Sequence, residues 1–416
     1  MSEPVDLVRQ QYEAYPYPSR DPKDEAKRLV TGSPSHLDEL THFLFGGRID
    51  RSPLKVLFAG GGTGDGLVML TQQLQDAGLA AEVTYLDLSS ASRAIAEARI
   101  AARDLPDVRF VSGSLLEVAT LAPGPYDYID CCGVLHHLED PDAGLAALTS
   151  VLAPGGGMGL MVYATLGRTG VYPMQRALRV FDDGLTPQKQ VALAKQLMAS
   201  LPKTNWFFRN AMLADHRASD AELYDLLLHS QDVPFSHDEL LAWLDRAGLA
   251  LVSHALPALY RPETYLSDPR LARRTAGLSF AERAALAEDL SGAIKNHIVY
   301  AARQDESEGR VADLDDPRMV PFLRAVDRDR LAKELAKGRP LSITLEDQAI
   351  SQSMPPMAAS IIGRCDGRLS IAAIHEQLAG LRGGLEWSEF KRQFDLVFAA
   401  LNGVGKLYLR LPEDSS

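Results

Sequence analysis

The sequence is poor in cysteine, and it contains no apolar run long enough to cross a membrane. Its cysteines are Cys131, Cys132 and Cys365, which are too few and too irregularly spaced for a disulfide framework or a zinc cluster. The residues after Met1 are polar and acidic, unlike a secretory signal. We therefore expect reduced cysteines, no membrane segment, no bound metal and a cytoplasmic location.

Positive charge is also scarce. The 416 residues include 43 Lys and Arg against 55 Asp and Glu, which gives a formal net charge of −12. This balance argues against broad non-specific binding to nucleic acid or to anionic membranes, although it does not exclude a local basic groove. Apolar residues make up 46% of the chain, as in ordinary globular proteins, and the length favours two or three domains. The oligomeric state stays open.

Glycines are concentrated between residues 60 and 66, directly after the apolar run 55–59. A helical pattern follows at 67–74, so the order is strand, tight turn and helix. Glycine adopts positive φ and lets a ligand approach the main chain, which is typical of a binding loop. The glycines alone fit equally well with a buried strand and a flexible turn.

Strand-like and helical patterns alternate over the next hundred residues. Further strands are expected at 81–89, 108–111, 126–133 and 158–163. The short connections predict a parallel sheet covered on both faces, with ligands beyond the carboxyl ends of its strands. Asp87 closes the second strand, where a carboxylate accepts hydrogen bonds from ribose hydroxyls. On these residues alone a generic dinucleotide fold remains an alternative.

Two motifs with the correct spacing narrow this choice. They are Gly133-Val134-Leu135-His136-His137-Leu138-Glu139-Asp140-Pro141 and Leu152-Ala153-Pro154-Gly155-Gly156. With the glycine loop and Asp87, they resemble class I S-adenosylmethionine-dependent methyltransferases between residues 50 and 165. Segments 11–18 and 228–235 look similar to a bacterial subgroup that is often fused to tetratricopeptide repeats, which this sequence lacks. The resemblance implies an α/β fold with a Rossmann-like, seven-stranded sheet, S-adenosylmethionine as cofactor, and methyl transfer.

The resemblance also implies which residues bind the cofactor. These are Gly60, Gly61, Gly62 and Gly64 under the methionine moiety and ribose, Asp87 and Leu88 at the ribose, Ser114 and Leu115 at the adenine, and Cys132 and Gly133 at the methionine end. Two positions depart from the family pattern. Phe58 stands where an acid usually helps to hold the amino group of the cofactor, and Ser114 stands where an aspartate is usual. Without an acid at position 58, another group must bind the amino group of the cofactor, or the protein binds that amino group more weakly.

The N-terminal segment holds three tyrosines within six residues, and prolines at 16 and 18 impose an extended path. If this segment covers the ligand as a lid, Tyr12 and Tyr17 contact the cofactor. The alternative is a surface loop whose rings pack on the domain.

Methyl transfer depends mainly on alignment, because the cofactor supplies the electrophile. Candidates for a base or for acceptor binding are His136, His137, Tyr163, Arg168, His229 and Asp232. One of the paired histidines has an alternative structural role at the start of the next helix. Arg168 either pairs with an acidic acceptor or lies in solvent. The aromatic segment 205–210 either lines the substrate pocket or packs helices together.

We expect four regions along the chain. They are an N-terminal lid segment and helix (1–48), a methyltransferase domain (49–304), a linker (305–340) and a small winged-helix-like α+β domain (341–416). Helical insertions are expected at about 171–231, as a substrate cover, and at about 257–293. The tail is weakly similar to peptide-binding modules, which is consistent with a peptide or protein acceptor recognised with its help; a small-molecule acceptor stays open. Its mixed charge disfavours DNA. The alternative function is a regulatory protein that binds S-adenosylmethionine without methyl transfer.

Overall fold

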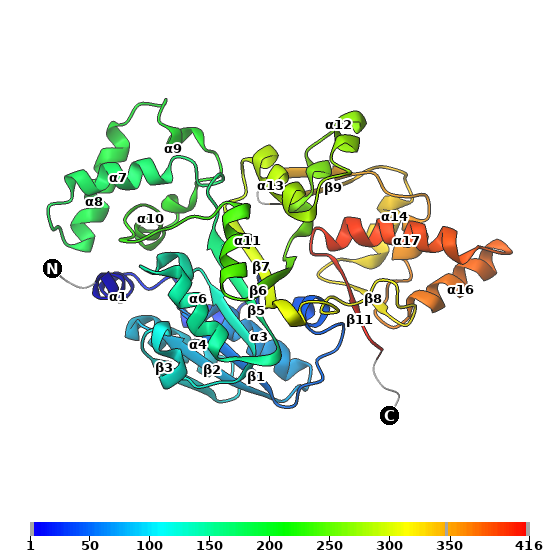
Figure 1. The fold of residues 1–416 in the computed structure, drawn as a ribbon, viewed down its shortest axis with the longest axis horizontal. Helices are drawn as coiled ribbons and strands as arrows, with labels where there is room; N and C mark the ends of the chain where they lie inside the picture. Colours follow the sequence, from blue (N-terminus) through cyan, green and yellow to red (C-terminus); the bar gives the residue numbers. More distant parts are fainter. Residues whose placement is uncertain (1–3, 346–347, 413–416) are drawn as a thin grey trace. The chain divides into compact units, whose positions relative to one another are not determined.

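The computed structural model describes residues 4–345 and 348–412. The chain divides into two compact units (Figure 1). The first contains the residues up to Leu37, Arg51–Ala250 and Gly292–Arg303, and the second contains Asp38–Asp50, Leu251–Ser291 and the residues from Gln304 on. The division after Arg303 lies where we expected a domain to end. Residues 38–50 and most of the insertion at 257–293, in contrast, group with the C-terminal part of the chain.

The central sheet has seven strands in the order β3-β2-β1-β4-β5-β7-β6. They are β1 (Leu54–Ala59), β2 (Ala81–Asp87), β3 (Val108–Ser112), β4 (Tyr126–Cys132), β5 (Leu152–Tyr163), β6 (Leu249–His254) and β7 (Asn296–Arg303). Strands β1 to β5 are parallel and β7 is antiparallel to β5. The expected seven-stranded Rossmann-like sheet is therefore confirmed, and β7 is an antiparallel strand within it.

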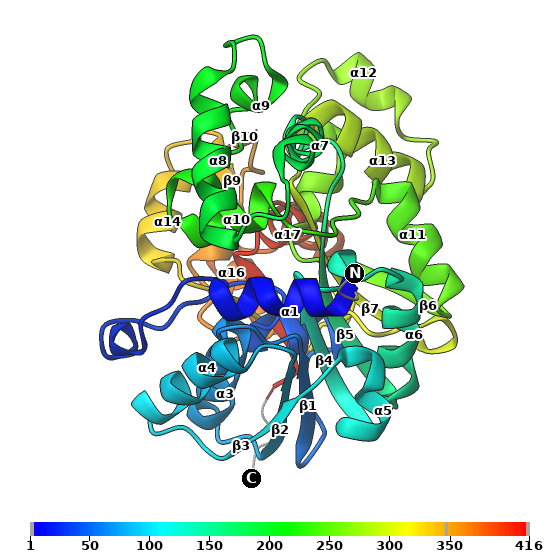
Figure 2. The same ribbon diagram turned by 90° about the vertical axis from the view of Figure 1, so that its left-hand side faces the viewer.

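Helices cover both faces of this sheet, as its apolar strands require. Those that follow the strands are α3 (Asp65–Asp76), α4 (Ser90–Ala102), α5 (Val118–Leu121), α6 (Pro141–Ser150) and α11 (His237–Arg246). Figure 2 shows α3 and α4 on one face and α5 and α6 on the other. Side-chain caps begin several of them: Ser89 accepts the Ser92 N–H, Asp140 caps α6, and Ser236 forms the expected capping box with Glu239.

A helical cover is inserted after β5. It comprises α7 (Val171–Phe181), α8 (Pro187–Ser200), α9 (Trp206–Arg209) and α10 (Asp220–Leu227), which share a buried apolar cluster. Helix α1 (Pro4–Ala14) lies between this cover and the sheet (Figure 2). Thr186 precedes α8 but makes no capping hydrogen bond with its side chain, and Pro187 occupies the first turn, where its fixed φ favours a helix start.

The second unit has its own apolar core. Its elements are a short helical segment formed by α2 (Leu37–Glu39) and the π-helix Leu40–Leu44, then α12 (Pro269–Arg274), α13 (Phe280–Ser291), β8 (Val320–Leu323), α14 (Arg328–Leu335), β9 (Leu341–Leu345), β10 (Gln348–Gln352), α15 (Ala358–Ile362), α16 (Ile371–Arg382), α17 (Trp387–Asn402) and β11 (Leu407–Arg410). Helices α15, α16 and α17 and strand β11 all lie within residues 341–416, where we expected a small α+β domain. A winged-helix relationship stays a prediction.

The expected linker at 305–340 is instead part of the second unit. Strand β8 pairs antiparallel with β11, and Met319 and Leu335 lie in the core (Figure 1). The sequence concealed this because β8 has only four residues and its flanks are charged. The π-helix also packs on β11: His42 Nδ1 accepts the Leu409 N–H at 3.2 Å, and Glu39 pairs with Arg324 at 2.7 Å.

No helix in the described part of the chain is long and apolar enough to span a membrane.

Candidate active site

A cavity of about 700 Å³ opens at the carboxyl ends of the central strands, and first-unit residues line it. All but one of the predicted cofactor residues border it. They are Tyr12, Tyr17, Gly60, Gly61, Gly62, Asp87, Leu88, Ser114, Leu115, Cys132 and Gly133. The exception is Gly64, which has φ of 94° before α3. A Cβ there would lie 3.1 Å from the Ala96 side chain, so this glycine serves the packing of α3 on α4.

The glycine loop brings bare backbone to the cavity wall. Gly60 and Gly62 have φ of 73° and 51°, which other residues rarely adopt. A Cβ at Gly60 would lie 2.4 Å from Val134 Cγ2, and one at Gly62 would lie 2.9 Å from the Tyr17 carbonyl oxygen. The loop therefore requires glycine both for its backbone conformation and for the close approach of neighbouring segments.

Asp87 ends β2 with its carboxylate on the cavity wall. Its Oδ2 accepts the Gly62 N–H and its Oδ1 accepts the Ser89 N–H, both at 2.8 Å. Burial raises the pKa of this carboxyl, and the two amides favour its charged form. They also fix its orientation, and carboxylate oxygens have spare lone pairs for a further donor such as a ribose hydroxyl. Ser114 lines the cavity as well, although its hydroxyl already accepts the Leu116 N–H at 3.2 Å.

The N-terminal segment lies on the glycine loop. The Tyr17 carbonyl accepts the Thr63 N–H at 3.4 Å, and the Pro18 carbonyl accepts the Thr63 hydroxyl at 2.8 Å. Glu13 accepts the Ser90 N–H at 2.6 Å at the start of α4. Tyr12 and Tyr17 line the cavity, whereas Tyr15 stacks on Tyr224 in the helical cover. These contacts support the lid interpretation for Tyr12 and Tyr17 and assign Tyr15 to packing.

Buried ion pairs hold the continuation of this segment. Glu25 pairs with Arg99 at 2.6 Å and also with Arg103. Asp65, in the first turn of α3, pairs with Arg99 at 2.7 Å and accepts the Arg20 Nε–H at 2.8 Å. The Arg99 and Glu25 side chains are 1% and 3% exposed, so each depends on its partner for charge compensation.

A carboxylate from the helical cover faces two tyrosines at the cavity wall. Asp225 Oδ2 accepts the Tyr163 hydroxyl at 2.7 Å, and Oδ1 accepts the Tyr12 hydroxyl at 3.3 Å. All three residues line the cavity. Burial raises the pKa of both tyrosines well above 10, so both remain protonated donors.

Two stacked histidines adjoin these tyrosines. His137 lines the cavity, and its Nδ1 lies 2.8 Å from the Gln231 carbonyl oxygen; Nδ1 therefore carries the proton and Nε2 the lone pair. The His229 ring stacks on it at 3.6 Å. His229 Nδ1 accepts the Gln231 N–H, which leaves Nε2–H to face the Tyr12 oxygen at 3.3 Å. Burial lowers the pKa of His229 well below 6.5, so this ring is neutral. His229 lies behind the cavity wall and positions Tyr12.

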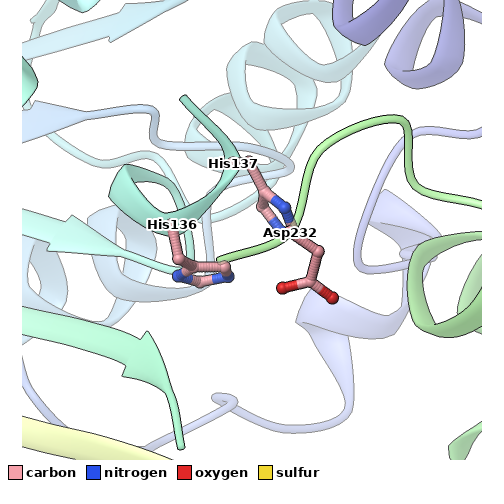
Figure 3. A group of neighbouring side chains, drawn as sticks. All are labelled: His136, His137 and Asp232. Carbon is pink, nitrogen blue, oxygen red and sulfur yellow. The ribbon is translucent and has the colours of Figure 1, made fainter. Parts of the chain in front are cut away.

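Two of the remaining predicted catalytic residues, His136 and Asp232, lie together beside His137 (Figure 3). His136 does not line the cavity, and its ring lies 3.9 Å from that of Tyr163. Asp232 also lies behind the wall, where its Oδ2 accepts Gln175 Nε2 at 3.0 Å and Arg168 Nη2 at 3.5 Å. Arg168 borders the cavity, is 3% exposed and lies 3.5 Å over the Tyr163 ring, so of the two alternatives the one that placed it in solvent is wrong.

Three neighbouring side chains have the spacing of a possible metal site. The ligand atoms of His136, His137 and Asp232 all lie within 4.8 Å of one another. Figure 3 shows the Asp232 carboxylate beside the two rings. However, the Arg168 guanidinium already supplies a positive charge next to this carboxylate. A second cation would be repelled there, so we assign no metal to the group.

Sequence reasoning missed several acids that line the cavity, among them Asp225 and Asp130. Asp225 is the single acid in the run Leu223 to Leu228, whereas Asp130 shares the run Tyr126 to Cys132 with Asp127. An acid within an otherwise apolar run was the available signal. The aromatic segment 205–210 does not line the cavity: Phe207 is buried in the helical cover and Trp206 is 61% exposed.

Several known proteins resemble this chain. Residues 57–158 match a family model described as a methyltransferase domain. An uncharacterized protein of Synechococcus sp., syc1184_c, is 31% identical over 298 residues, which cover 70% of each chain. The ubiquinone biosynthesis O-methyltransferase of Albidiferax ferrireducens is 29% identical over 91 residues, which cover 22% of this chain and 35% of that enzyme.

The fold also occurs in solved structures. PKMT2 from Rickettsia typhi matches with a TM-score of 0.63 and 15% identity, over 90% of this chain and 75% of that one. PKMT2 in complex with AdoHcy gives a TM-score of 0.62 and 16% identity, over 91% and 76% of the two chains. At these identities the similarity shows a shared fold.

Proposed function

We propose that this chain, which belongs to the class I S-adenosylmethionine-dependent methyltransferases, methylates an amine nitrogen carried by a peptide or protein. The family membership follows from the methyltransferase-domain match, the shared fold and the sheet order. It makes S-adenosylmethionine the cofactor. The nature of the acceptor is our proposal, and it is based on the groups that border the cavity beyond the cofactor residues.

The cavity residues fit this cofactor. Asp87 is oriented by two amides to accept ribose hydroxyls, and Gly60 to Gly62 present backbone without side chains. Ser114 and Leu115 would border the adenine, and Cys132 and Gly133 the methionine end. When bound, S-adenosylmethionine supplies a methyl group on a positively charged sulfur. The task of the protein residues is to exclude water and to align a deprotonated nucleophile.

One observation carries the assignment to an amine: Asp225 presents a carboxylate to the cavity between Tyr12 and Tyr163. An amine arrives from water as an ammonium ion, which a carboxylate attracts. It must lose a proton before it can act as a nucleophile, and the His137 Nε2 lone pair is available to accept one. Arg168 would attract an acidic acceptor, but Asp232 and the Tyr163 ring already engage it.

The proposal of a peptide or protein acceptor is supported by the second unit. This unit has its own core, and the residues that line the cavity in the described part of the chain all belong to the first unit. A unit that contributes nothing to the cofactor cavity is free to recognise the molecule that carries the amine. The predicted similarity of its tail to peptide-binding modules supports the same proposal.

The test is to incubate the protein with S-adenosylmethionine carrying a labelled methyl group and with a lysate of its source organism. We expect label on protein that survives mild base, because methylated amines are stable whereas methyl esters hydrolyse. Label confined to small molecules, or label released by base, would contradict the proposed acceptor. Tight cofactor binding without transfer to any fraction would favour the alternative, a regulatory protein that binds S-adenosylmethionine.

A further inference from the structure

Phe58 leaves the cofactor site without an acid at a position where the family usually has one. Its side chain is 1% exposed and lines the cavity two residues before Gly60. An apolar ring cannot pair with the ammonium group of the methionine moiety. A second group must compensate that charge if the cofactor is to be held at both ends.

The neighbouring strand supplies a carboxylate at the same level. Strand β4 runs parallel to β1, and Asp130 is the register partner of Phe58. Residues in register on adjacent parallel strands project to the same face of the sheet. Both side chains reach the first turn of α3: a Cβ on Gly66 would lie 3.3 Å from Phe58 Cε1 and 3.6 Å from Asp130 Oδ2. Both line the cofactor cavity.

The Asp130 carboxylate has hydrogen-bond donors but no cation beside it. Its Oδ2 accepts the Ser35 hydroxyl, and the Cys132 N–H donates to the same carboxylate. Across residues 4–345 and 348–412, no Lys, Arg or His forms an ion pair with it. It is 5% exposed, and burial raises its pKa to about 7. A buried carboxylate in this state is stabilised by any cation that enters the cavity beside it.

We infer that Asp130 is the counter-ion of the cofactor ammonium group and takes over the role of the acid that Phe58 replaces. Cys132 and Gly133, which follow Asp130 directly, are the residues assigned to the methionine end. The cations of S-adenosylmethionine lie at this end, whereas its adenine and ribose are neutral. The inference depends on the cofactor and is independent of the acceptor.

The test compares two ligands by calorimetry, S-adenosylhomocysteine and 5′-methylthioadenosine. They share the thioether and the nucleoside, and 5′-methylthioadenosine lacks the amino-acid part. We expect Asp130→Asn to weaken S-adenosylhomocysteine binding by about tenfold or more, since a charge-assisted contact is lost, and to leave 5′-methylthioadenosine within about twofold. Equal losses for both ligands, or no loss for either, would overturn the inference.

Glu139→Gln is the matched control, because Glu139 is an acid that also lines the cavity but lies exposed beyond β4. It should leave the ratio of the two affinities unchanged. A measurement on the unmodified protein covers the case in which Asp130→Asn does not fold: S-adenosylhomocysteine lacking its α-amino group should bind at least about tenfold more weakly than the parent ligand. Equal binding would exclude a counter-ion at Asp130 without any variant. Failure of methyl transfer in the labelling experiment would leave these binding results intact.

Discussion

The Tyr163 hydroxyl donates to Asp225 Oδ2 across 2.7 Å, joining the end of β5 to helix α10 of the inserted cover. The two residues are 62 positions apart in the chain. Through this bond, the inserted cover adds one carboxylate to the cavity besides those that the strands provide. The proposed function assigns this carboxylate to the acceptor and leaves the cofactor to the strand ends.

Asp225→Asn tests whether Asp225 serves the acceptor and not the cofactor. The amide retains the shape but loses the negative charge, so an incoming ammonium group is no longer attracted. We expect kcat/KM for the acceptor to fall by roughly 10- to 100-fold, while the dissociation constant for S-adenosylhomocysteine changes by less than about threefold. Steady-state kinetics and calorimetry check the two parts. An equal loss in cofactor affinity would place Asp225 in the cofactor site instead.

Asp87→Ala removes the carboxylate that the Gly62 and Ser89 amides orient. Loss of charge-assisted bonds to the ribose should cost roughly 1–3 kcal/mol of cofactor binding, which titration calorimetry measures. Asp76→Ala is a suitable control, because Asp76 is exposed at the end of α3, where it accepts a hydrogen bond from the Gln72 side chain at 2.9 Å. Unchanged cofactor affinity in Asp87→Ala would refute its ribose role.

The lid interpretation predicts a difference between neighbouring tyrosines. Tyr12→Phe removes the hydroxyl that links His229 to Asp225, whereas Tyr15→Phe alters a ring stacked on Tyr224. We expect Tyr12→Phe to reduce turnover by about tenfold and Tyr15→Phe by less than about twofold. Comparable effects of the two substitutions, measured as initial rates at saturating cofactor, would show that the segment acts only through packing.

His42 predicts a dependence of stability on pH. Burial lowers its pKa to about 4, below the value of 6.5 in an unfolded chain, so the unfolded state binds more protons between these values. Its contribution is complete above pH 6.5 and is lost as the pH falls toward 4, by up to roughly 3 kcal/mol. Denaturant unfolding at several pH values, compared with His42→Gln, measures this. The difference between the two proteins should shrink on acidification, and a constant difference would contradict the expected proton linkage.

Local patterns were sufficient for the sheet and for much of the cavity wall. The glycine loop and Asp87 were predictable because strand ends, turns and helix starts are encoded over a few residues. Asp225 and Asp130 were not, because their roles depend on partners such as Tyr12 and Ser35, which lie on distant parts of the chain. The same limit affected β8, whose partner β11 lies more than 80 residues further on. His136 and His137 are adjacent in sequence, yet only His137 lines the cavity.

The pairing of Glu25 with Arg99 and Arg103 determines where the chain can be shortened. A protein that begins after Glu25 would keep an Arg99 side chain that is 1% exposed, with one of its two carboxylate partners deleted together with the lid and only Asp65 left. Loss of one partner of a buried ion pair typically costs about 3–5 kcal/mol, and the remaining Asp65 contact makes this range an upper bound for the truncation. The N-terminal segment therefore supplies a buried acid to the unit that contains the sheet, and any replacement for this segment would have to supply an acid of its own.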